Sequence, residues 1–307
     1  MKSKRLSRLI DMTYKSIGKY IPFFGCMMTT KYPWFEAAVR KTAAKIGMEL
    51  IDIDGFTCCP DPIYYQARDK MEWYTIAARN ISLAEDLGYD LITTCSGCTA
   101  TLSEVNLALK EDPGLKAKVN ERLKKIGREF KGSINVRHAV TVIRDDFGFE
   151  QVTKTVTRPL EGLKVAVHYG CHLLKPSRVM RVDDPNHPTI LENLLKAIGA
   201  EPIHHDKTML CCGKACMSDA IPEQMIMDIL ETIKSREADC MGLICPTCFD
   251  QFDIRQIILG RKHKKKLDVP IIYYFQLLGL AQGLNTKDVG LQMHKVKADQ
   301  IFEKVLA

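Results

Sequence analysis

Two pairs of adjacent cysteines are the residues in this sequence that most clearly point to chemistry. The pairs are Cys58–Cys59 and Cys211–Cys212, and each is followed at once by a proline or a glycine. Neighbouring Cα atoms lie about 3.8 Å apart, whereas a disulfide usually needs about 4.4–6.8 Å, so neither pair is expected to be a disulfide. We expect the adjacent thiols to bind a metal centre instead.

The cysteines form a series that occurs twice along the chain. The first series reads C-x31-C-C-x35-C-x2-C and the second reads C-x39-C-C-x32-C-x2-C. The predicted metal ligands are Cys26, Cys58, Cys59, Cys95, Cys98, Cys171, Cys211, Cys212, Cys245 and Cys248. Cys216 and Cys240 lie outside both series, and we expect them to be small buried side chains, with Cys216 as an alternative ligand.

The number of cysteines in each series helps to choose the metal. A structural zinc site closes with four ligands, and the common cubane iron–sulfur cluster also uses four. Five cysteines in each half favour an iron–sulfur cluster with a larger ligand demand or a different shape. A zinc-binding assembly scaffold without turnover is the alternative from a different class of protein.

The segments between the cysteines alternate between strand and helix patterns. This alternation predicts an α/β fold of two duplicated Rossmann-like halves related by a pseudo-twofold axis, with mainly parallel sheets. The expected strands cover residues 20–26, 49–59, 89–95, 163–171, 200–212 and 240–248, and the expected helices cover 32–48, 67–88, 187–199 and 221–238. Ligands of such sheets bind beyond the carboxyl ends of the strands, where every cysteine of the two series falls.

The pattern predicts five consecutive parts of the chain. They are a basic N-terminal extension over 1–19, a first half over 20–147, a linker over 148–162, a second half over 163–285 and a C-terminal tail or helix over 286–307. The extension carries six Lys or Arg residues against one Asp, which suits either docking to a partner protein or a frayed, solvated end.

Composition and charge exclude several classes of protein. The net charge of +7 is modest for 307 residues, and no stripe of basic and aromatic residues predicts nucleic-acid binding. No apolar stretch reaches the roughly 20 residues of a membrane span, and the N-terminus lacks the apolar core of a signal peptide. We therefore expect a cytoplasmic protein without a membrane span.

The sequence lacks the motifs of a complete electron-transfer enzyme. It contains neither a C-x2-C-x2-C-x3-C-P run nor a G-x-G-x-x-G loop after a strand, so no flavin or nicotinamide is expected on this chain. Electrons for any redox reaction are expected to arrive from another protein.

The duplicated series, with "TCCPDP" and "LCCGKAC" as its two CC segments, resembles the CCG-domain family, and most closely the B subunits of methanogen heterodisulfide reductases. The resemblance covers about residues 20–285. It implies one noncubane [4Fe-4S] cluster in each half, held by five cysteines, with adjacent thiolates on neighbouring irons. The catalytic region would then lie around Cys58, Cys59, Cys211 and Cys212.

The resemblance also implies a reaction and its partners. The coenzyme M–coenzyme B heterodisulfide, an anionic substrate of methanogenesis, would lie between the two clusters and be reduced to two thiols in two one-electron steps with cluster-bound thiolates. A ferredoxin-like protein, the reductase's C component, would donate the electrons. Beyond it would stand a flavin-containing protein, the A component, and a hydrogenase or formate dehydrogenase module, in an electron-bifurcating complex. The alternative is a CCG protein of another iron–sulfur oxidoreductase, acting on a quinone, an organic acid or a sulfur carrier.

Four further side chains are candidates for contact with the substrate. His172 follows Cys171 and either hydrogen-bonds the substrate, donates a proton to a leaving thiolate or satisfies backbone groups of its loop. Lys214 either holds a sulfonate and balances cluster charge or is simply solvated. Arg178 and Arg181 either meet a phosphate or carboxylate of the substrate or carry surface charge.

Overall fold

The computed structural model describes residues 18–216, 218, 220–298 and 301–303, and it confirms the predicted α/β fold. Two four-stranded parallel sheets have the orders β2-β1-β3-β4 and β6-β5-β7-β8. The strands are β1 (Lys19–Phe23), β2 (Glu49–Leu50), β3 (Leu91–Thr93), β4 (Val136–His138), β5 (Lys164–His168), β6 (Glu201–Ile203), β7 (Cys240–Leu243) and β8 (Ile271–Tyr273).

Helices connect the strands and cover the sheets. In the first half they are α1 (Pro33–Ile46), α2 (Tyr64–Arg68), α3 (Lys70–Glu85), α4 (Ser96–Glu111), α5 (Pro113–Lys124) and α6 (Ala139–Val142). In the second half they are α8 (Ser177–Met180), α9 (Ile190–Ala197), α10 (Ala220–Ser235), α11 (Pro246–Phe249), α12 (Arg255–His263) and α13 (Tyr274–Ala281). Four further short helical segments are η2 (Met27–Lys31), η3 (Ile143–Phe147), η4 (Asp250–Ile254) and η5 (Leu291–Met293).

The two sheets repeat each other residue by residue. In the first, Thr93 of β3 pairs with His138 of β4, and in the second, Leu243 of β7 pairs with Tyr273 of β8. Since Thr93 and Leu243 both stand two residues before a CxxC motif, the equivalence of the halves can be followed position by position. The predicted duplication is therefore confirmed at the level of strand register.

Two strands are much shorter than predicted. The expected strand over 49–59 contains only the two-residue β2, and the expected strand over 200–212 contains only β6. In the first case Gly55 has a φ of +92°, which extended backbone does not allow, and Asp52 and Asp54 disfavour a strand. The CC pairs are therefore carried by the loops that follow β2 and β6 rather than by the strands themselves.

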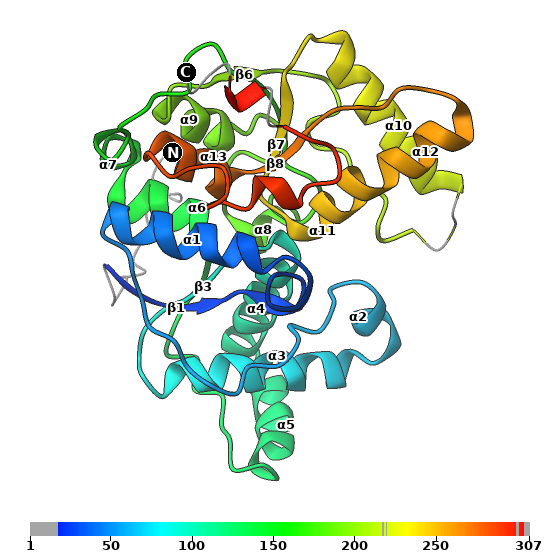
Figure 1. The fold of residues 1–307 in the computed structure, drawn as a ribbon. Coiled ribbons are helices and arrows are strands. Elements are labelled where there is room, and N and C mark those ends of the chain that lie inside the picture. The colour runs from blue at the N-terminus through cyan, green and yellow to red at the C-terminus, as the bar shows by residue number, and fades with distance from the viewer. Residues whose placement is uncertain (1–17, 217, 219, 299–300, 304–307) are drawn as a thin grey trace, which may run out of the picture.

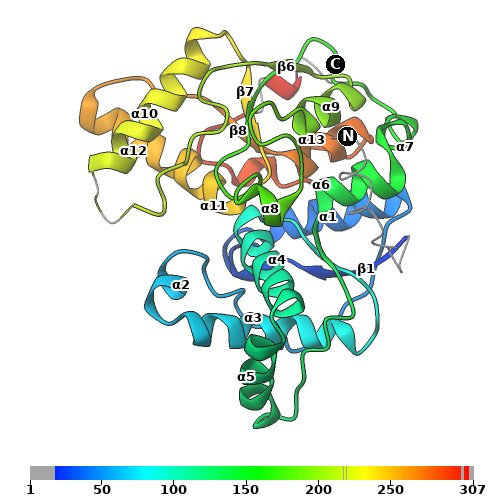
Figure 2. The same ribbon diagram turned by 180° about the vertical axis from the view of Figure 1, so that it is seen from behind.

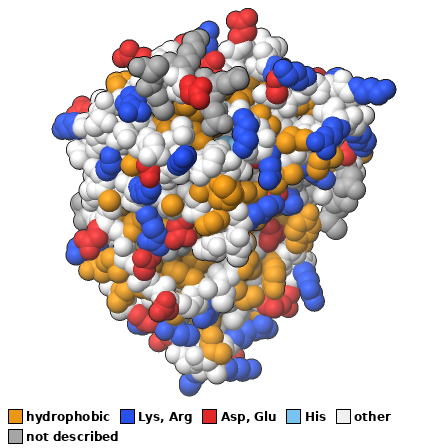
Figure 3. Space-filling view, in the orientation of Figure 1, with side chains coloured by type: hydrophobic (Ala, Val, Ile, Leu, Met, Phe, Trp, Pro, Cys, Tyr) orange, Lys and Arg blue, Asp and Glu red, His pale blue; other side chains and the backbone are white. Residues whose placement is uncertain are grey.

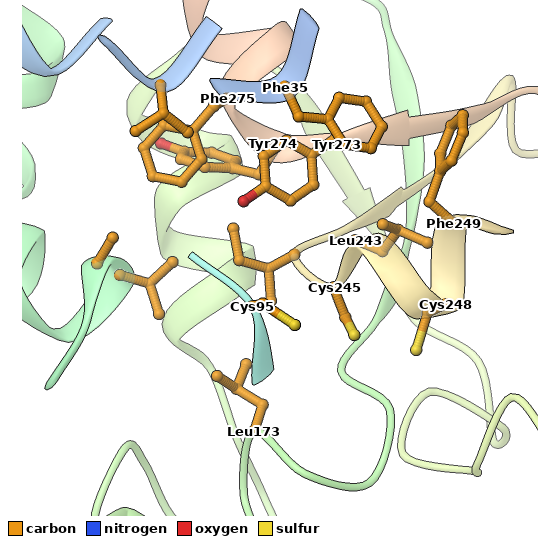
Figure 4. Packing of buried hydrophobic residues seen from close by; sticks show 14 of the residues in the cluster. Phe35, Cys95, Leu173, Leu243, Cys245, Cys248, Phe249, Tyr273, Tyr274 and Phe275 are labelled. Carbon is orange, nitrogen blue, oxygen red and sulfur yellow. The ribbon is translucent and has the colours of Figure 1, made fainter. Parts of the chain in front are cut away.

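An aromatic core joins the two halves (Figure 4). The Phe35 ring of α1 stacks on Tyr273 with centroids 4.6 Å apart and meets the edge of Phe249 at 4.8 Å. The Tyr273 hydroxyl donates a hydrogen bond of 2.6 Å to the carbonyl oxygen of Thr94 in the other half. Figures 1 and 2 both place α1 beside α13, which it contacts. The halves thus share one interior rather than meeting through a flexible joint.

The two segments predicted as linker and tail both contain ordered structure. The linker range holds the helix α7 (Phe149–Lys154), which packs against α9. In the tail, Lys41 forms an ion pair of 2.8 Å with Asp288, and Phe302 is buried. Most of the predicted extension, residues 1–17, lies outside the described residues.

On the surface, charges of both signs are mixed. On the face drawn in Figure 3, Lys and Arg side chains lie among Asp and Glu side chains and small apolar areas. None of the helices that the structure describes combines the length and the apolar character needed to cross a membrane.

Truncating the aromatic core should weaken the whole fold. We expect Phe35→Ala to lower the free energy of unfolding by about 3–5 kcal/mol, because the ring is fully buried between the halves. Chemical denaturation followed by circular dichroism measures this change. The control is Ile126→Ala at a side chain that is 60% exposed, which should change stability by less than about 0.5 kcal/mol. Equal midpoints for the two variants would contradict the shared core.

Candidate metal centres

The fold brings the ten series cysteines to the carboxyl ends of the strands in the same way in both halves. Cys26 and Cys171 each stand three residues after the first strand of their half, β1 or β5. Cys95 and Cys245 each stand two residues after the third strand, β3 or β7. All twelve cysteines of the chain are free. The parallel sheets therefore collect five thiols at one edge of each half, as the spacing predicted.

The thiols of each half are neighbours in a line, in which each thiol lies close enough to shift the pKa of the next. In the first half the line runs Cys26, Cys58, Cys59, Cys98 and Cys95. In the second half the line has the equivalent order Cys171, Cys211, Cys212, Cys248 and Cys245, and the first two sulfurs are 3.7 Å apart.

The two lines meet where Cys95 and Cys245 are neighbours, each close enough to shift the pKa of the other. Both residues occupy the same position in their own half, so the junction lies on the pseudo-twofold axis and the order of the ten thiols reads the same from either end. In Figure 4 the side chains of Cys95, Cys245 and Cys248 point toward the same space below the aromatic core. The cysteines of both halves thus form one continuous set.

The donor set fits an iron–sulfur cluster in each half. Thiolates are the ligands that iron–sulfur clusters use, and five lie together in each half. A single zinc ion is held by four ligands, so one thiol of the five in each half would be left over. This arrangement suits a centre with several irons better than one zinc ion.

Several of the thiols have a raised pKa, so metal binding must remove their protons. Contact with Cys59 and burial raise the pKa of Cys98, and contact with Cys212 and burial do the same for Cys248. Thiols must ionise to bind a metal, so loading the site releases protons and is opposed by low pH.

Two glycines leave room for the sulfurs. Gly25 and Gly170 precede the first cysteine of each series and have φ values of +72° and +68°. A Cβ atom on Gly25 would stand 2.6 Å from the Cys98 sulfur, and one on Gly170 would stand 3.3 Å from the Cys248 sulfur. Any side chain at either position would therefore press on the cysteine that it faces.

A hollow of about 560 Å³, open to solvent, lies between the halves beside the second set of thiols. All five cysteines of the second half line it, and the first half contributes Ser96 and Gly97 from inside its own CxxC motif and Tyr64 from α2. The thiols of the first half do not line this hollow, and Cys26 and Cys58 instead open onto a separate one. The halves are thus alike in fold but differ in what their thiols face.

The structure separates the four further candidates. His172 and Lys214 both line the hollow, and the Tyr64 hydroxyl lies 3.4 Å from the carbonyl oxygen of Lys214. Arg178 and Arg181 are not among its lining residues. Arg178 forms an exposed ion pair of 2.9 Å with Glu111, and Arg181 lines a different hollow beside β4. A substrate role for the two arginines stays a prediction that this geometry does not support.

The two cysteines outside the series behave differently from each other. Cys240 in β7 is fully buried, as expected. Cys216 is only partly buried and lines a surface hollow together with Lys214, so the expected buried position is wrong. Its loop begins at Gly213, whose φ of +82° turns the chain directly after the CC pair and carries Cys216 outward.

Sequence reasoning missed several buried polar groups near the thiols. The Ser96 hydroxyl, both ring nitrogens of His168 and Nε2 of His138 are buried without a hydrogen-bond partner. Burial lowers the pKa of His168 to about 4 and that of His138 to about 3. Strand register was the signal that could have found the histidines, because each is the last residue of a strand that ends beside the cysteines.

A methyl group at Gly25 should disturb one metal centre. We expect Gly25→Ala to lower the iron and acid-labile sulfide bound per chain by about half, because the added carbon displaces the Cys98 sulfur in one half only. Iron and sulfide analysis after anaerobic reconstitution measures the loss. Gly88→Ala is the matched control, since Gly88 has a φ of +73° but nothing within 4 Å of the added carbon. Full loading of Gly25→Ala would contradict the assignment.

Comparison with known proteins agrees with this geometry. The family model of the CCG cysteine-rich domain matches residues 20–103 and again residues 165–253. The B subunit of the ferredoxin/F420H2-dependent CoB-CoM heterodisulfide reductase of Methanosarcina acetivorans is 35% identical over 293 residues, which cover 94% of this chain and 97% of that protein.

The chain is also similar to a subunit of a fumarate reductase and to one solved structure. The membrane anchor subunit of the 8-methylmenaquinol:fumarate reductase of Wolinella succinogenes is 32% identical, covering 92% of this chain and 99% of that protein. A crystal structure of a hypothetical protein from Helicobacter pylori shares the fold, with a TM-score of 0.73 and 17% identity, over 96% of this chain and 56% of that one. With two CCG domains and relatives that match over nearly their full length, the chain belongs to the CCG cysteine-rich domain family that includes the heterodisulfide reductase B subunits.

Proposed function

We propose that this chain is the catalytic subunit that reduces the coenzyme M–coenzyme B heterodisulfide to its two thiols, with a noncubane [4Fe-4S] cluster on the five cysteines of each half. The single observation that carries the proposal is the hollow between the halves, which all five thiols of the second half line together with Ser96 and Gly97 from the CxxC motif of the first half. The names of the Methanosarcina relatives support the choice of substrate.

The chain's own residues prepare the hollow for this chemistry. When bound, the clusters supply the two electrons that cleavage of a disulfide consumes. His172 lies in the lining next to Cys171, where an imidazole nitrogen can hold a proton and pass it to a departing thiolate. The buried Ser96 hydroxyl also lines the hollow without a partner and can donate a hydrogen bond to a substrate sulfur or oxygen.

The mouth of the hollow suits an anionic disulfide. Lys214 is exposed there, with its backbone held near the Tyr64 hydroxyl. A cation at the mouth draws an anionic substrate inward and orients its charged group away from the thiols. Asp61 also lines the hollow but accepts hydrogen bonds from the backbone N–H groups of Ile63 and Tyr64, which occupies its oxygen.

The electrons come from partner proteins in this proposal. The ferredoxin-like C component donates directly, and the flavin-containing A component and a hydrogenase or formate dehydrogenase module stand behind it. We place this work in the cytoplasm, a reducing compartment in which thiols do not pair as disulfides.

One observation favours a second candidate function. The Wolinella relative is named as part of a fumarate reductase that uses 8-methylmenaquinol, and it matches over 99% of its length. The same thiol set could therefore serve an iron–sulfur protein that exchanges electrons with a quinone. The two candidates differ in whether the hollow binds a disulfide.

The deciding experiment is oxidation of reduced viologen by the anaerobically purified, iron-loaded protein. Turnover that depends on the heterodisulfide and is lost in Cys211→Ala supports the first candidate. An iron-loaded protein that ignores the heterodisulfide but oxidises viologen with a menaquinone analogue supports the second. A colourless protein that binds zinc and no iron overturns both.

Removing the charge at the mouth should weaken substrate capture. We expect Lys214→Ala to raise KM for the heterodisulfide about fivefold with little change in kcat, because one solvent-exposed charge interaction is worth about 1 kcal/mol. Steady-state kinetics at low ionic strength gives both constants. Lys125→Ala, which removes an exposed lysine just after α5, is the control and should leave KM unchanged. A fall in kcat without a change in KM would assign Lys214 a different role.

A further inference from the structure

His168 is a buried side chain that the proposed reaction does not use. It is the last residue of β5 and only 1% exposed, and neither of its ring nitrogens has a hydrogen-bond partner. A neutral or protonated imidazole always carries at least one N–H donor. Burying a donor without an acceptor is costly, so an acceptor that the chain itself does not supply is expected beside the ring.

The ring faces the thiols of the second half. The position that a Cβ atom on Gly170 would take lies 3.3 Å from the Cys248 sulfur and 3.5 Å from Nε2 of His168. The nitrogen and the sulfur therefore border the same small space. The ring also packs edge-to-face with Phe252, with the ring centroids 4.9 Å apart.

The equivalent residue of the first half is Phe23. Phe23 ends β1 three residues before Cys26, as His168 ends β5 three residues before Cys171. A Cβ atom on Gly25 would lie 2.6 Å from the Cys98 sulfur and 3.7 Å from Cε1 of Phe23. Cys98 and Cys248 are equivalent cysteines. The space beside Cys98 is bordered by the Phe23 ring, whereas the space beside Cys248 is bordered by the His168 imidazole.

His138, a second buried imidazole near the thiols, does not account for this difference. Nδ1 of His138 accepts a hydrogen bond of 3.2 Å from the backbone N–H of Val140, so Nε2 carries the ring hydrogen. His138 is equivalent by register to Tyr273, and both rings lie near the contact between Cys95 and Cys245. His138 therefore lies where the two sets of thiols meet, whereas His168 lies beside the thiols of the second half alone.

We propose that the His168 imidazole donates a hydrogen bond to a sulfur of the cluster in the second half and thereby gives it a higher reduction potential than the cluster beside Phe23. The proposal rests on the part of the proposed function that places a cluster in each half. One-electron reduction adds negative charge to cluster sulfurs, and a donor aimed at them stabilises that charge. The first electron from an external reductant therefore resides on the cluster that borders the hollow. His168 is a positioning residue in this role.

A redox titration of the iron-loaded full chain tests the proposal without any substrate. The reductant is dithionite, each cluster takes one electron, and electron paramagnetic resonance follows the reduced fraction. We expect two midpoint potentials in the parent protein. His168→Phe should lower the higher one and leave the other in place, and Phe23→His should raise the lower one. His168→Gln keeps an N–H donor, so its higher midpoint potential should stay closer to the parent value than that of His168→Phe.

A spectroscopic signature separates the hydrogen bond from a packing effect. In protein labelled with ¹⁵N-histidine, the half-reduced cluster should show a hyperfine coupling to nitrogen that His168→Phe removes. His187→Phe, at an exposed histidine, is the matched control and should keep the coupling. Unchanged potentials in both His168→Phe and Phe23→His would overturn the role of His168 while two loaded clusters remained. A chain that binds no iron would instead overturn the proposed function as well.

Discussion

The placement of Cys95 beside Cys245 is the constraint on which the arrangement of the ten thiols depends. Each cysteine follows the third strand of its sheet, so this placement requires the carboxyl ends of the two sheets to face each other across a pseudo-twofold axis. The aromatic core around Phe35 and Tyr273 lies directly against this junction and holds the sheets in that orientation. The duplication is therefore more than two linked domains, because this placement exists only when both halves are present.

The two halves have the same fold, but they contribute different residues to the hollow between them. Strand order, strand register and cysteine order agree between the halves, yet the hollow between them is bordered by the thiols of the second half alone. Phe23 and His168 show the same division at a single pair of equivalent positions. Duplication supplies two equivalent places for ligands, and substitutions at a few strand ends can make them chemically different.

The fold class and the gathering of the ten series cysteines could be predicted from sequence because both depend on local spacing. Strand and helix patterns have short periods, and cysteines that follow strands of a parallel sheet must gather at one edge. The lengths of β2 and β6 could not be predicted in this way, since Val, Ile and Leu favour a strand until a residue such as Gly55 turns the chain. The positions of Arg178 and Arg181 depend on how α8 packs against α4, which no local pattern records.

The shared aromatic core also sets the order of events during synthesis. Phe35 belongs to α1, early in the chain, but it packs against Phe249 and Tyr273, which leave the ribosome only after most of the chain has been made. Until then the Phe35 face of α1 has nothing to pack against, and Cys95 has no neighbouring thiol from the second half. The thiol set of the second half therefore comes into existence only after Cys248 has been made, and metal insertion into that half has to follow it.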